Sequence, residues 1–148
     1  MNPNNDGVDH LNVFSKAKTW LGVFLSNFSD CNVVTEDGPF RTIEGYWYWL
    51  SCRDDRLRTT SGFESKRLGR NLRSRDYIKS EEFNKKILKA IALKLVGNER
   101  CITELKACKL PIVHYYVYGN RVIEPKDGLW MMSFLDAFRL ELQKDIQV

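Results

Sequence analysis

Four consecutive aromatic residues, Tyr46 to Trp49, are the feature that most limits how this chain can fold. They follow the carboxylate of Glu44 within residues 40–50. Because neighbouring side chains of a helix point to different sides, the four rings cannot all face one core. Some of them should line a cleft or pack beneath the carboxylate. Rings around a carboxylate remove it from water, which raises its pKa and makes it a candidate acid or base.

The same stretch also allows a purely structural interpretation. The rings would then form the buried side of a core helix. Glu44 would lie in the exposed first turn, where its negative charge complements the helix dipole. Structural roles are commoner than catalytic ones for such residues, so this stretch taken by itself favours the structural interpretation.

Helix caps and apolar spacing predict a mainly helical α+β fold with a few short strands. The clearest helix covers residues 81–96, where Ser80 can cap the start and apolar residues recur every four positions, at Phe83, Ile87, Ile91 and Leu95. Weaker patterns predict further elements: helices over about 99–109 and 129–143, strands at 13–14, 33–35, 40–41, 112–118 and 121–123, an extended or loop segment through residue 28, and a basic loop over 70–75.

Two more helices are predicted from their first residues. Thr42 can cap a helix over about 43–52, which would carry Glu44 and the aromatic run. Ser61 and Glu64 match a capping box for a short helix, which Gly69 is expected to end. The last predicted helix, 129–143, should turn its larger apolar residues to the core: Trp130, Phe134, Leu135, Phe138 and Leu142.

The chain is long enough for one domain, which we expect to cover residues 13–148 after a flexible segment at 1–12. It has no apolar run of about 18 residues, and its first residues lack a signal-peptide pattern. We therefore expect a cytoplasmic protein without a membrane span.

The chain's cysteines and histidines are scattered and match no metal motif: Cys31, Cys52, Cys101, Cys108, His10 and His114. Reduced thiols, no metal and no cofactor are therefore expected. The sequence also lacks the glycine-rich phosphate loops, the zinc-protease motif and the serine-hydrolase elbow. Nucleoside-triphosphate chemistry and standard proteolysis are accordingly unsupported.

Positive charge is concentrated in one segment. Residues 53–75 hold eight basic and three acidic residues, a net charge of +5, whereas the whole chain carries only +4. One basic segment on an almost neutral body is typical of a phosphate-binding surface, although a solvated helix and loop would have the same composition. A carboxylate beside aromatic rings is in turn suited to sugar chemistry, because it can stabilise a positively charged transition state while a ring stacks on a base.

Several short motifs in this order resemble the NADAR family, also called YbiA-like. They are Phe14-Ser15-Lys16, Phe24-Leu25-Ser26-Asn27-Phe28, Thr42-Ile43-Glu44 and Leu68-Gly69-Arg70, and the resemblance covers residues 14–140. It implies a mostly helical fold and cleavage of N-glycosidic bonds. Some members act on ribosylated pyrimidine intermediates of riboflavin synthesis. Others remove ADP-ribose from guanine in DNA and reverse toxins of the DarT type, and this chain looks most like the phage members of that branch. For a chain encoded by a phage, the expected compartment is the cytoplasm of the host cell.

The resemblance assigns roles to individual residues. Glu44 matches the catalytic glutamate, and Asn27 and Phe28 match the element that lines the nucleotide-sugar pocket. Arg70 matches a phosphate contact. The loop Tyr118-Gly119-Asn120 matches the family's Trp-Gly-Asp loop loosely, with Asn120 in place of a second catalytic carboxylate.

The helical spacing adds Trp47 and Tyr48, three and four residues after Glu44, as rings on its side of the helix. Lys16 or Arg67 is expected to help hold the pyrophosphate. The implied activity is therefore hydrolysis of the bond between ADP-ribose and a DNA base, with ADP-ribosylated DNA as partner and ADP-ribose as product. Two alternatives stay open: the same chemistry on a riboflavin intermediate, and a module that binds ADP-ribose or nucleic acid without cleaving it.

Overall fold

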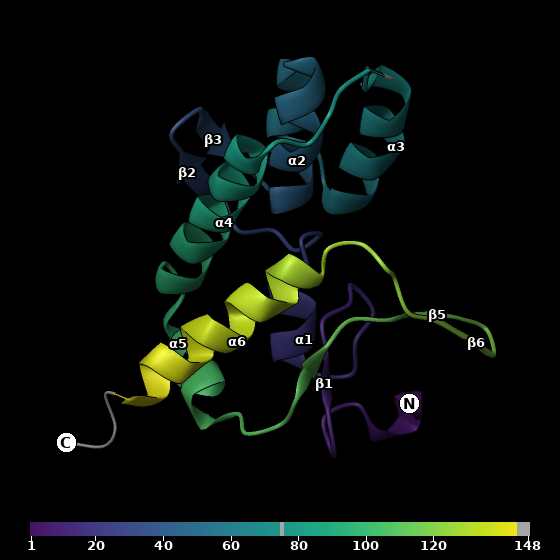
Figure 1. Ribbon diagram of the computed structural model, residues 1–148, viewed down its shortest axis with the longest axis vertical. Coiled ribbons are helices and arrows are strands. Elements are labelled where there is room, and N and C mark those ends of the chain that lie inside the picture. The colour runs from purple at the N-terminus through teal and green to yellow at the C-terminus, as the bar shows by residue number, and fades with distance from the viewer. Residues whose placement is uncertain (75, 145–148) are drawn as a thin grey trace. The chain divides into compact units, whose positions relative to one another are not determined.

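The computed structural model describes residues 1–74 and 76–144, and it has the predicted α+β composition (Figure 1). Six α-helices and six short strands lie within these described ranges. The chain divides into two compact units. The central unit is Asn27–Gly97, and the terminal unit combines Met1–Ser26 with Asn98–Val148. No change of composition near residues 26 or 97 marks the boundaries between these units, so they were not predicted.

The central unit holds a hairpin, a short 3-10 helix and three α-helices. The hairpin pairs β2 with β3 in antiparallel register, with Val33 opposite Phe40. The bounds of its elements in chain order are β2 Val33–Thr35, β3 Gly38–Phe40, α2 Ile43–Cys52, η2 Asp55–Arg58, α3 Gly62–Leu72 and α4 Glu81–Val96. The predicted hairpin and the predicted helices over 43–52 and 81–96 are thereby confirmed.

Helix α2 begins where its cap predicts. The Thr42 hydroxyl accepts a hydrogen bond from the Gly45 amide at 3.0 Å, and Thr42 is fully buried. The helix ends at Arg53, whose left-handed backbone (φ 58°) stops the hydrogen-bond ladder. Glu44 therefore lies in the first turn of α2, and the aromatic run follows within the same helix.

Replacing Thr42 by Val is expected to lower the free energy of unfolding by about 1–2 kcal/mol, because the similar shape is kept but the Gly45 amide loses its acceptor. Urea unfolding followed by circular dichroism measures the change. Thr42→Ser is the matched control: it keeps the oxygen and should cost less, roughly the value of one methyl group. Equal stability of Thr42→Val and the wild type would contradict the capping role.

Helix α3 corrects two predictions. It starts after Ser61, whose hydroxyl accepts from the Glu64 amide at 3.2 Å, as the capping pattern indicates. It does not end at Gly69 but continues to Leu72, so Arg70 belongs to a helix and not to a basic loop. Gly69 lies within the helix and does not end it. Its small size allows close packing against Tyr48, as described for the site below. Arg75, the last basic residue of the segment, lies outside the described residues.

Tyr46, Tyr48 and Trp49 of the four consecutive aromatic residues are buried, and two of them pack against the hairpin. The rings of Tyr46 and Trp49 both pack against Phe40, with centroid distances of 4.7 and 5.5 Å. The Tyr46 hydroxyl donates to Asp37 at 2.7 Å, and the Trp49 indole donates to Asp55 at 3.0 Å. These two rings fix α2 against the hairpin and η2, which leaves Trp47 and Tyr48 on other sides of the helix.

The terminal unit is built from both ends of the chain. Strand β1 pairs in parallel with β4, so Leu11 lies opposite Ile112, and β5 pairs antiparallel with β6. The bounds of its elements are η1 Pro3–Asn5, β1 Leu11–Asn12, α1 Trp20–Leu25, α5 Glu99–Ala107, β4 Ile112–Val113, β5 Tyr116–Tyr118, β6 Arg121–Ile123 and α6 Leu129–Lys144.

Several predictions in the terminal unit are wrong in detail. The strand expected at 13–14 is β1, two residues earlier, and the expected loop before residue 28 contains α1. Thr19 caps α1 by accepting from the Gly22 amide at 2.9 Å, and Trp20 stacks on Phe24 one turn later at 5.0 Å. Helix α5 ends at Ala107 and not at 109. In α6, only Leu135 of the five expected core residues is fully buried; the other four keep part of their surface exposed.

The strand predicted over 112–118 is interrupted at Tyr115, because this residue takes part in a buried hydrogen-bond network. Asn12 and Tyr115 exchange two bonds, from the Tyr115 amide to the Asn12 side chain at 2.9 Å and from that side chain to the Tyr115 carbonyl at 3.0 Å. The Tyr115 hydroxyl lies 2.6 Å from Nε2 of buried His10. Residues 1–12, which the sequence predicts to be flexible, are therefore tied to β4 and the residues after it.

Candidate functional site

The amide of Glu44 links α2 to the preceding segment. It donates a hydrogen bond of 3.0 Å to the carbonyl of Asn27. The next residue, Phe28, lies against the start of α3, so closely that a Cβ on Gly62 would overlap the Phe28 backbone. The structure thus places Asn27 at the first turn of α2 and Phe28 at the start of α3.

Helix α3 packs on α2 through small residues. Gly62, Ser65 and Gly69 are all buried and recur at helical spacing along one side of α3. A Cβ on Gly69 would overlap the ring base of Tyr48, so only glycine allows the two helices to approach this closely. This close approach carries the neighbouring basic residues of α3 toward Glu44.

Two of these basic residues are held beside aromatic rings. Lys66 places its Nζ 5.7 Å from the centroid of the Phe28 ring. One turn later, the Arg70 guanidinium donates to the hydroxyl of Tyr48. Both positive charges act on the Glu44 carboxyl. The predicted contacts Phe28, Tyr48 and Arg70 therefore lie together around the predicted catalytic residue.

A third cation comes from the link between α3 and α4. Lys79 lies with its Nζ 4.6 Å from the Trp47 ring centroid, and its charge also acts on Glu44. The Trp47 ring meets Phe83 of α4 edge-on at 4.8 Å. Lys66, Arg70 and Lys79 are called the three-cation cluster below. Together with Glu44 and the rings of Phe28, Trp47 and Tyr48 they form the Glu44 site.

The electrostatics of the site set Glu44 between its two protonation states. Burial of the carboxyl raises its pKa from 4.5 to about 7, and the charges of Lys66, Arg70 and Lys79 oppose this rise without cancelling it. At neutral pH the carboxyl can thus either give or take a proton, which is the condition for general acid or base catalysis.

Tyr48 responds to the same environment. Burial raises the pKa of its hydroxyl first, and the nearby negative charge of Glu44 raises it further, while Arg70 opposes both effects. The hydroxyl therefore stays protonated at neutral pH and can donate a hydrogen bond. Tyr48 is buried, whereas Trp47 and Phe28 keep part of their surface exposed.

The basic segment contains two groups of side chains with different surroundings. Three of its arginines are paired locally on the surface, at distances of 2.6–2.8 Å: Arg56 with Asp54, Arg58 with Asp55 and Arg67 with Glu64. Arg67, which was expected to help hold a phosphate, is therefore already paired with the Glu64 carboxylate. Lys66 and Arg70, on another side of α3, instead face the site.

Sequence reasoning missed Lys66 and Lys79. Lys66 could have been found, because it precedes Arg70 by four residues and so shares its side of the helix. Lys79 had no such signal, since its place depends on how the link between α3 and α4 returns to Trp47. Both residues come to the site through tertiary packing.

Three predicted site residues belong to the terminal unit. Lys16 lies exposed in the turn before α1, Tyr118 ends β5, and Asn120 lies in the turn between β5 and β6. Their proposed roles in catalysis or substrate binding stay predictions. Within residues 1–74 and 76–144, no three His, Cys, Asp or Glu side chains gather as a metal site would require. In the same ranges no helix has the length and apolar character to cross a membrane.

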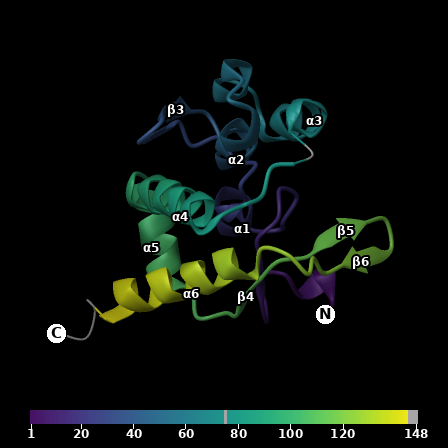
Figure 2. The ribbon, with the colours of Figure 1, turned by 45° about the horizontal axis from the view of Figure 1, so that its top comes forward.

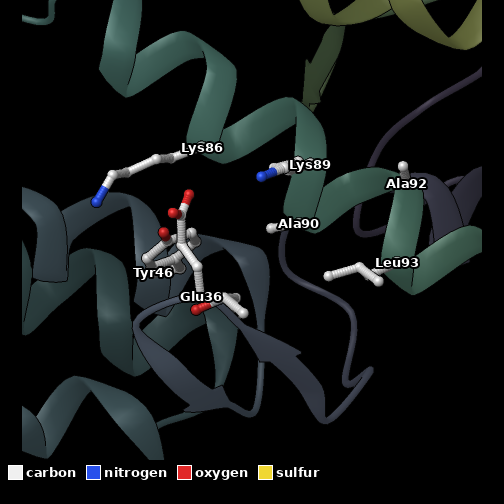
Figure 3. Close-up of a pocket in the computed structure, with 8 residues that line it drawn as sticks. Glu36, Tyr46, Lys86, Lys89, Ala90, Ala92 and Leu93 are labelled. Carbon is white, nitrogen blue, oxygen red and sulfur yellow. The ribbon is translucent and has the colours of Figure 1, made fainter.

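A separate cavity of about 320 Å³ lies in the central unit, between the β2–β3 hairpin, α2 and α4 (Figure 3). Part of its polar wall is engaged in an internal network: Tyr46 and Lys86 both donate to the same oxygen of Asp37, at 2.7 and 3.0 Å. Leu93 and neighbouring alanines form the apolar wall. Because these polar groups satisfy one another, the cavity is a weaker candidate for function than the Glu44 site.

Replacing Lys66 by Met is expected to raise the pKa of Glu44 above about 7, by roughly half a unit to one unit, because one stabilising positive charge is lost. A carboxyl ¹³C NMR titration, with Glu44→Gln used for assignment, measures the change. Arg67→Met on the same helix is the matched control, since Arg67 pairs with Glu64 and not with Glu44. An unchanged Glu44 titration in Lys66→Met would contradict the described electrostatics.

Comparison with known proteins identifies the fold. No protein-family model matches the chain, and no curated protein matches it by sequence. Among solved structures, the NMR structure of the E. coli protein YbiA is similar, with a TM-score of 0.61 and 16% sequence identity. The match covers 99% of this chain and 94% of that chain. The chain therefore has a YbiA-like fold, as the sequence motifs indicated.

Proposed function

We propose, with the YbiA-like fold as premise, that this protein is an N-glycosidase of the NADAR type. Its proposed substrate is ADP-ribose joined to a DNA base, with guanine as the base, and its products are free ADP-ribose and the restored base. The observation that supports this best is the Glu44 site, where a carboxyl with a pKa of about 7 faces three cations. In a cell the enzyme would act in the cytoplasm as an antitoxin against a DarT-type toxin, in the anti-defence role of a phage protein.

The proposed reaction is hydrolysis of an N-glycosidic bond, in which Glu44 acts on the water and on the developing charge. The bond between C1″ of the ribose and the base nitrogen breaks, and its electron pair stays on the nitrogen. Water supplies a hydroxyl group to C1″, and its proton ends on the base. In this scheme the Glu44 carboxylate stabilises the positive charge that develops at C1″ and orients the water. Its pKa near neutrality allows it to take the water proton and pass it on.

The three-cation cluster supports an anionic substrate. With Glu44 ionised, the cluster and the carboxylate carry a net charge of +2, which matches the two negative charges of a diphosphate. The rings of Phe28 and Trp47 lie beside Lys66 and Lys79, keep part of their surface exposed and would provide apolar surfaces for a base or ribose. A substrate that combines phosphates, a sugar and a base fits these contacts better than an uncharged glycoside does.

Two other functions remain as alternatives. The same cations would accept the single phosphate of a ribosylated pyrimidine from riboflavin synthesis, so the chemistry would be kept and the substrate changed. A binding module without catalysis is favoured by one observation, the asparagine at position 120 where the resembled family has a carboxylate. In that case the cluster would bind ADP-ribose without cleaving it.

One experiment separates these functions. Purified protein is incubated with single-stranded oligonucleotides that carry ADP-ribose on guanine or on thymine, and in parallel with the ribosylated pyrimidine. Mass spectrometry identifies free ADP-ribose and the restored oligonucleotide. The proposal predicts release from the guanine oligonucleotide. Turnover of the pyrimidine alone would favour the riboflavin alternative, and saturable ADP-ribose binding without any release would favour the binding module.

A further inference from the structure

The ring of Tyr48 is fixed in place by the packing of α3 on α2. The two helices lie side by side in the central unit (Figure 2). Tyr48 follows Glu44 by four residues, so both side chains lie on the same side of α2. The Tyr48 ring occupies the space that Gly69 leaves open, since a Cβ at that position would overlap it. Packing therefore sets the direction of the ring and, with it, the position of the Tyr48 hydroxyl.

The Tyr48 hydroxyl has a proton that it can give. Arg70 donates to the hydroxyl oxygen, and a guanidinium has donors only, so the O–H hydrogen of Tyr48 is left for another acceptor. No residue within 1–74 and 76–144 accepts it. Burial and the charge of Glu44 raise the pKa of Tyr48. The hydroxyl therefore keeps its proton until a strongly basic group is placed beside it.

The Glu44 carboxyl is also open to an incoming group. It forms no hydrogen bond or ion pair with the residues that the structure describes. Among those residues, no completely buried side-chain oxygen lacks a partner, so the Glu44 oxygens keep some accessible surface. A free carboxyl and a free hydroxyl proton thus lie on the same side of α2.

The proposed reaction needs two groups that transfer protons. When the bond between C1″ and the base nitrogen breaks, the electron pair makes that nitrogen strongly basic, and a proton must reach it. In a direct displacement, water approaches C1″ from the side opposite the base. One carboxyl cannot serve both sides at once. If Glu44 takes the water proton, another group must supply the proton for the base.

The other groups near Glu44 fit this role less well than Tyr48 does. The two lysines of the three-cation cluster are held over aromatic rings, and loss of a proton would remove the positive charge that a diphosphate requires. The Arg70 guanidinium is not deprotonated in proteins. The two histidines of the chain, His10 and His114, belong to the terminal unit. Tyr48 remains as the proton donor.

We propose that Tyr48 is the general acid of the Glu44 site and gives its hydroxyl proton to the leaving base. Arg70 stabilises the phenolate that forms. Glu44 takes one proton from the attacking water and passes it to the Tyr48 oxygen, so both residues end as they began. Water is consumed, and ADP-ribose and the protonated base are formed. This inference rests on the proposed function and deepens it, because it names the substrate class: ADP-ribose joined to a nitrogen that cannot leave without a proton.

The test separates protonation of the leaving group from binding. Tyr48→Phe keeps the ring beside Gly69 and loses only the hydroxyl. Two substrates share the ADP-ribose part: the oligonucleotide with ADP-ribose on guanine, and ADP-ribose joined to p-nitrophenol, which leaves as a stable anion without a proton. Tyr48→Phe is expected to release ADP-ribose from guanine roughly 10²–10⁴-fold more slowly than the wild type, and from nitrophenol at a rate within about threefold of it.

Two further variants make the result specific. Tyr77→Phe is the matched control, because it removes a hydroxyl from the link between α3 and α4, where the Tyr77 ring centroid lies 6.1 Å from that of Phe83. It should act on both substrates like the wild type. Glu44→Gln should slow both reactions, since both need the water. Calorimetric titration with ADP-ribose is expected to give Tyr48→Phe the affinity of the wild type.

The possible outcomes distinguish this inference from the proposed function. An equal loss of rate on both substrates in Tyr48→Phe would mark the hydroxyl as structural, and unchanged release from guanine would show that it is not needed. Either result would overturn the inference and leave the proposed function standing. A wild type that cleaves the nitrophenol compound but not the guanine oligonucleotide would contradict the proposed function and, with it, the role of Tyr48.

Discussion

Replacing Glu44 by Gln is expected to stabilise the protein at about pH 8 by up to about 3 kcal/mol, the free energy that corresponds to the shift of its pKa from 4.5 to about 7. The folded protein holds the Glu44 proton more tightly than the unfolded chain does. Stability of the wild type therefore falls between pH 4.5 and 7, where the unfolded chain alone has released this proton. Glutamine has no proton to release, so it avoids that loss.

The pH dependence makes this prediction specific. The advantage of Glu44→Gln should vanish below pH 4.5, where both states of the wild type are protonated, and should be complete above about pH 7. Urea unfolding across this range measures it. Glu64→Gln is the matched control, because it removes only a surface ion pair and should change stability by less than about 1 kcal/mol. A Glu44→Gln variant no more stable than the wild type at high pH would contradict the raised pKa of Glu44.

Replacing Gly69 by Ala is expected to destabilise the protein by about 2–3 kcal/mol, although alanine is the better helix former by about 1 kcal/mol. The reason is steric. The added Cβ would overlap the ring base of Tyr48, so α2 and α3 must separate. Because this contact also holds Arg70 near Tyr48, the affinity for ADP-ribose should fall as well. Thermal unfolding and calorimetric titration with ADP-ribose measure the two effects.

A second glycine provides the control. Gly97 caps α4 with an ordinary helical backbone (φ −79°), and its nearest neighbour for an added Cβ is a carbonyl oxygen at 3.1 Å. Gly97→Ala should therefore change stability by less than about 1 kcal/mol and leave ADP-ribose binding unchanged. If Gly69→Ala behaved in the same way, the close packing of α3 on α2 could not be what positions Arg70.

The sequence predicted best where local signals decide the structure. Helix α2 starts after Thr42 and α4 starts after Ser80, as their caps indicated, and both end where predicted. Helix α3 was predicted too short because glycine is read as a helix end from sequence alone. In the structure Gly69 instead makes room for Tyr48, which is a tertiary requirement without a local sign.

The terminal unit was harder to predict for the same reason. Helix α1 has only six residues, and its apolar side is too short to show a helical period. The pairing of β1 with β4 joins residues about one hundred positions apart, which no local pattern reveals. The polar contacts of Asn12 and His10 with Tyr115 span the same separation, so no local pattern reveals them either.

Some residues of the candidate site could be predicted from the sequence, whereas the two lysines of the three-cation cluster were missed. Motifs indicated Glu44 and Arg70, and helical spacing indicated Tyr48, all of which the central unit brings together. The place of Lys79 depends on the path of the link between α3 and α4. Lys66 was hidden in a run of basic residues, of which Arg56, Arg58 and Arg67 pair with carboxylates on the surface.

Release of ADP-ribose by the wild type and by Glu44→Gln, followed side by side, tests the central claim most directly. The substrate is a single-stranded oligonucleotide with ADP-ribose on guanine, and near-ultraviolet circular dichroism verifies that the variant is folded. We expect release by the wild type and a rate roughly 10²–10⁴-fold lower for Glu44→Gln, the usual contribution of a positioned acid or base. A folded Glu44→Gln variant that releases ADP-ribose at the wild-type rate would contradict the account.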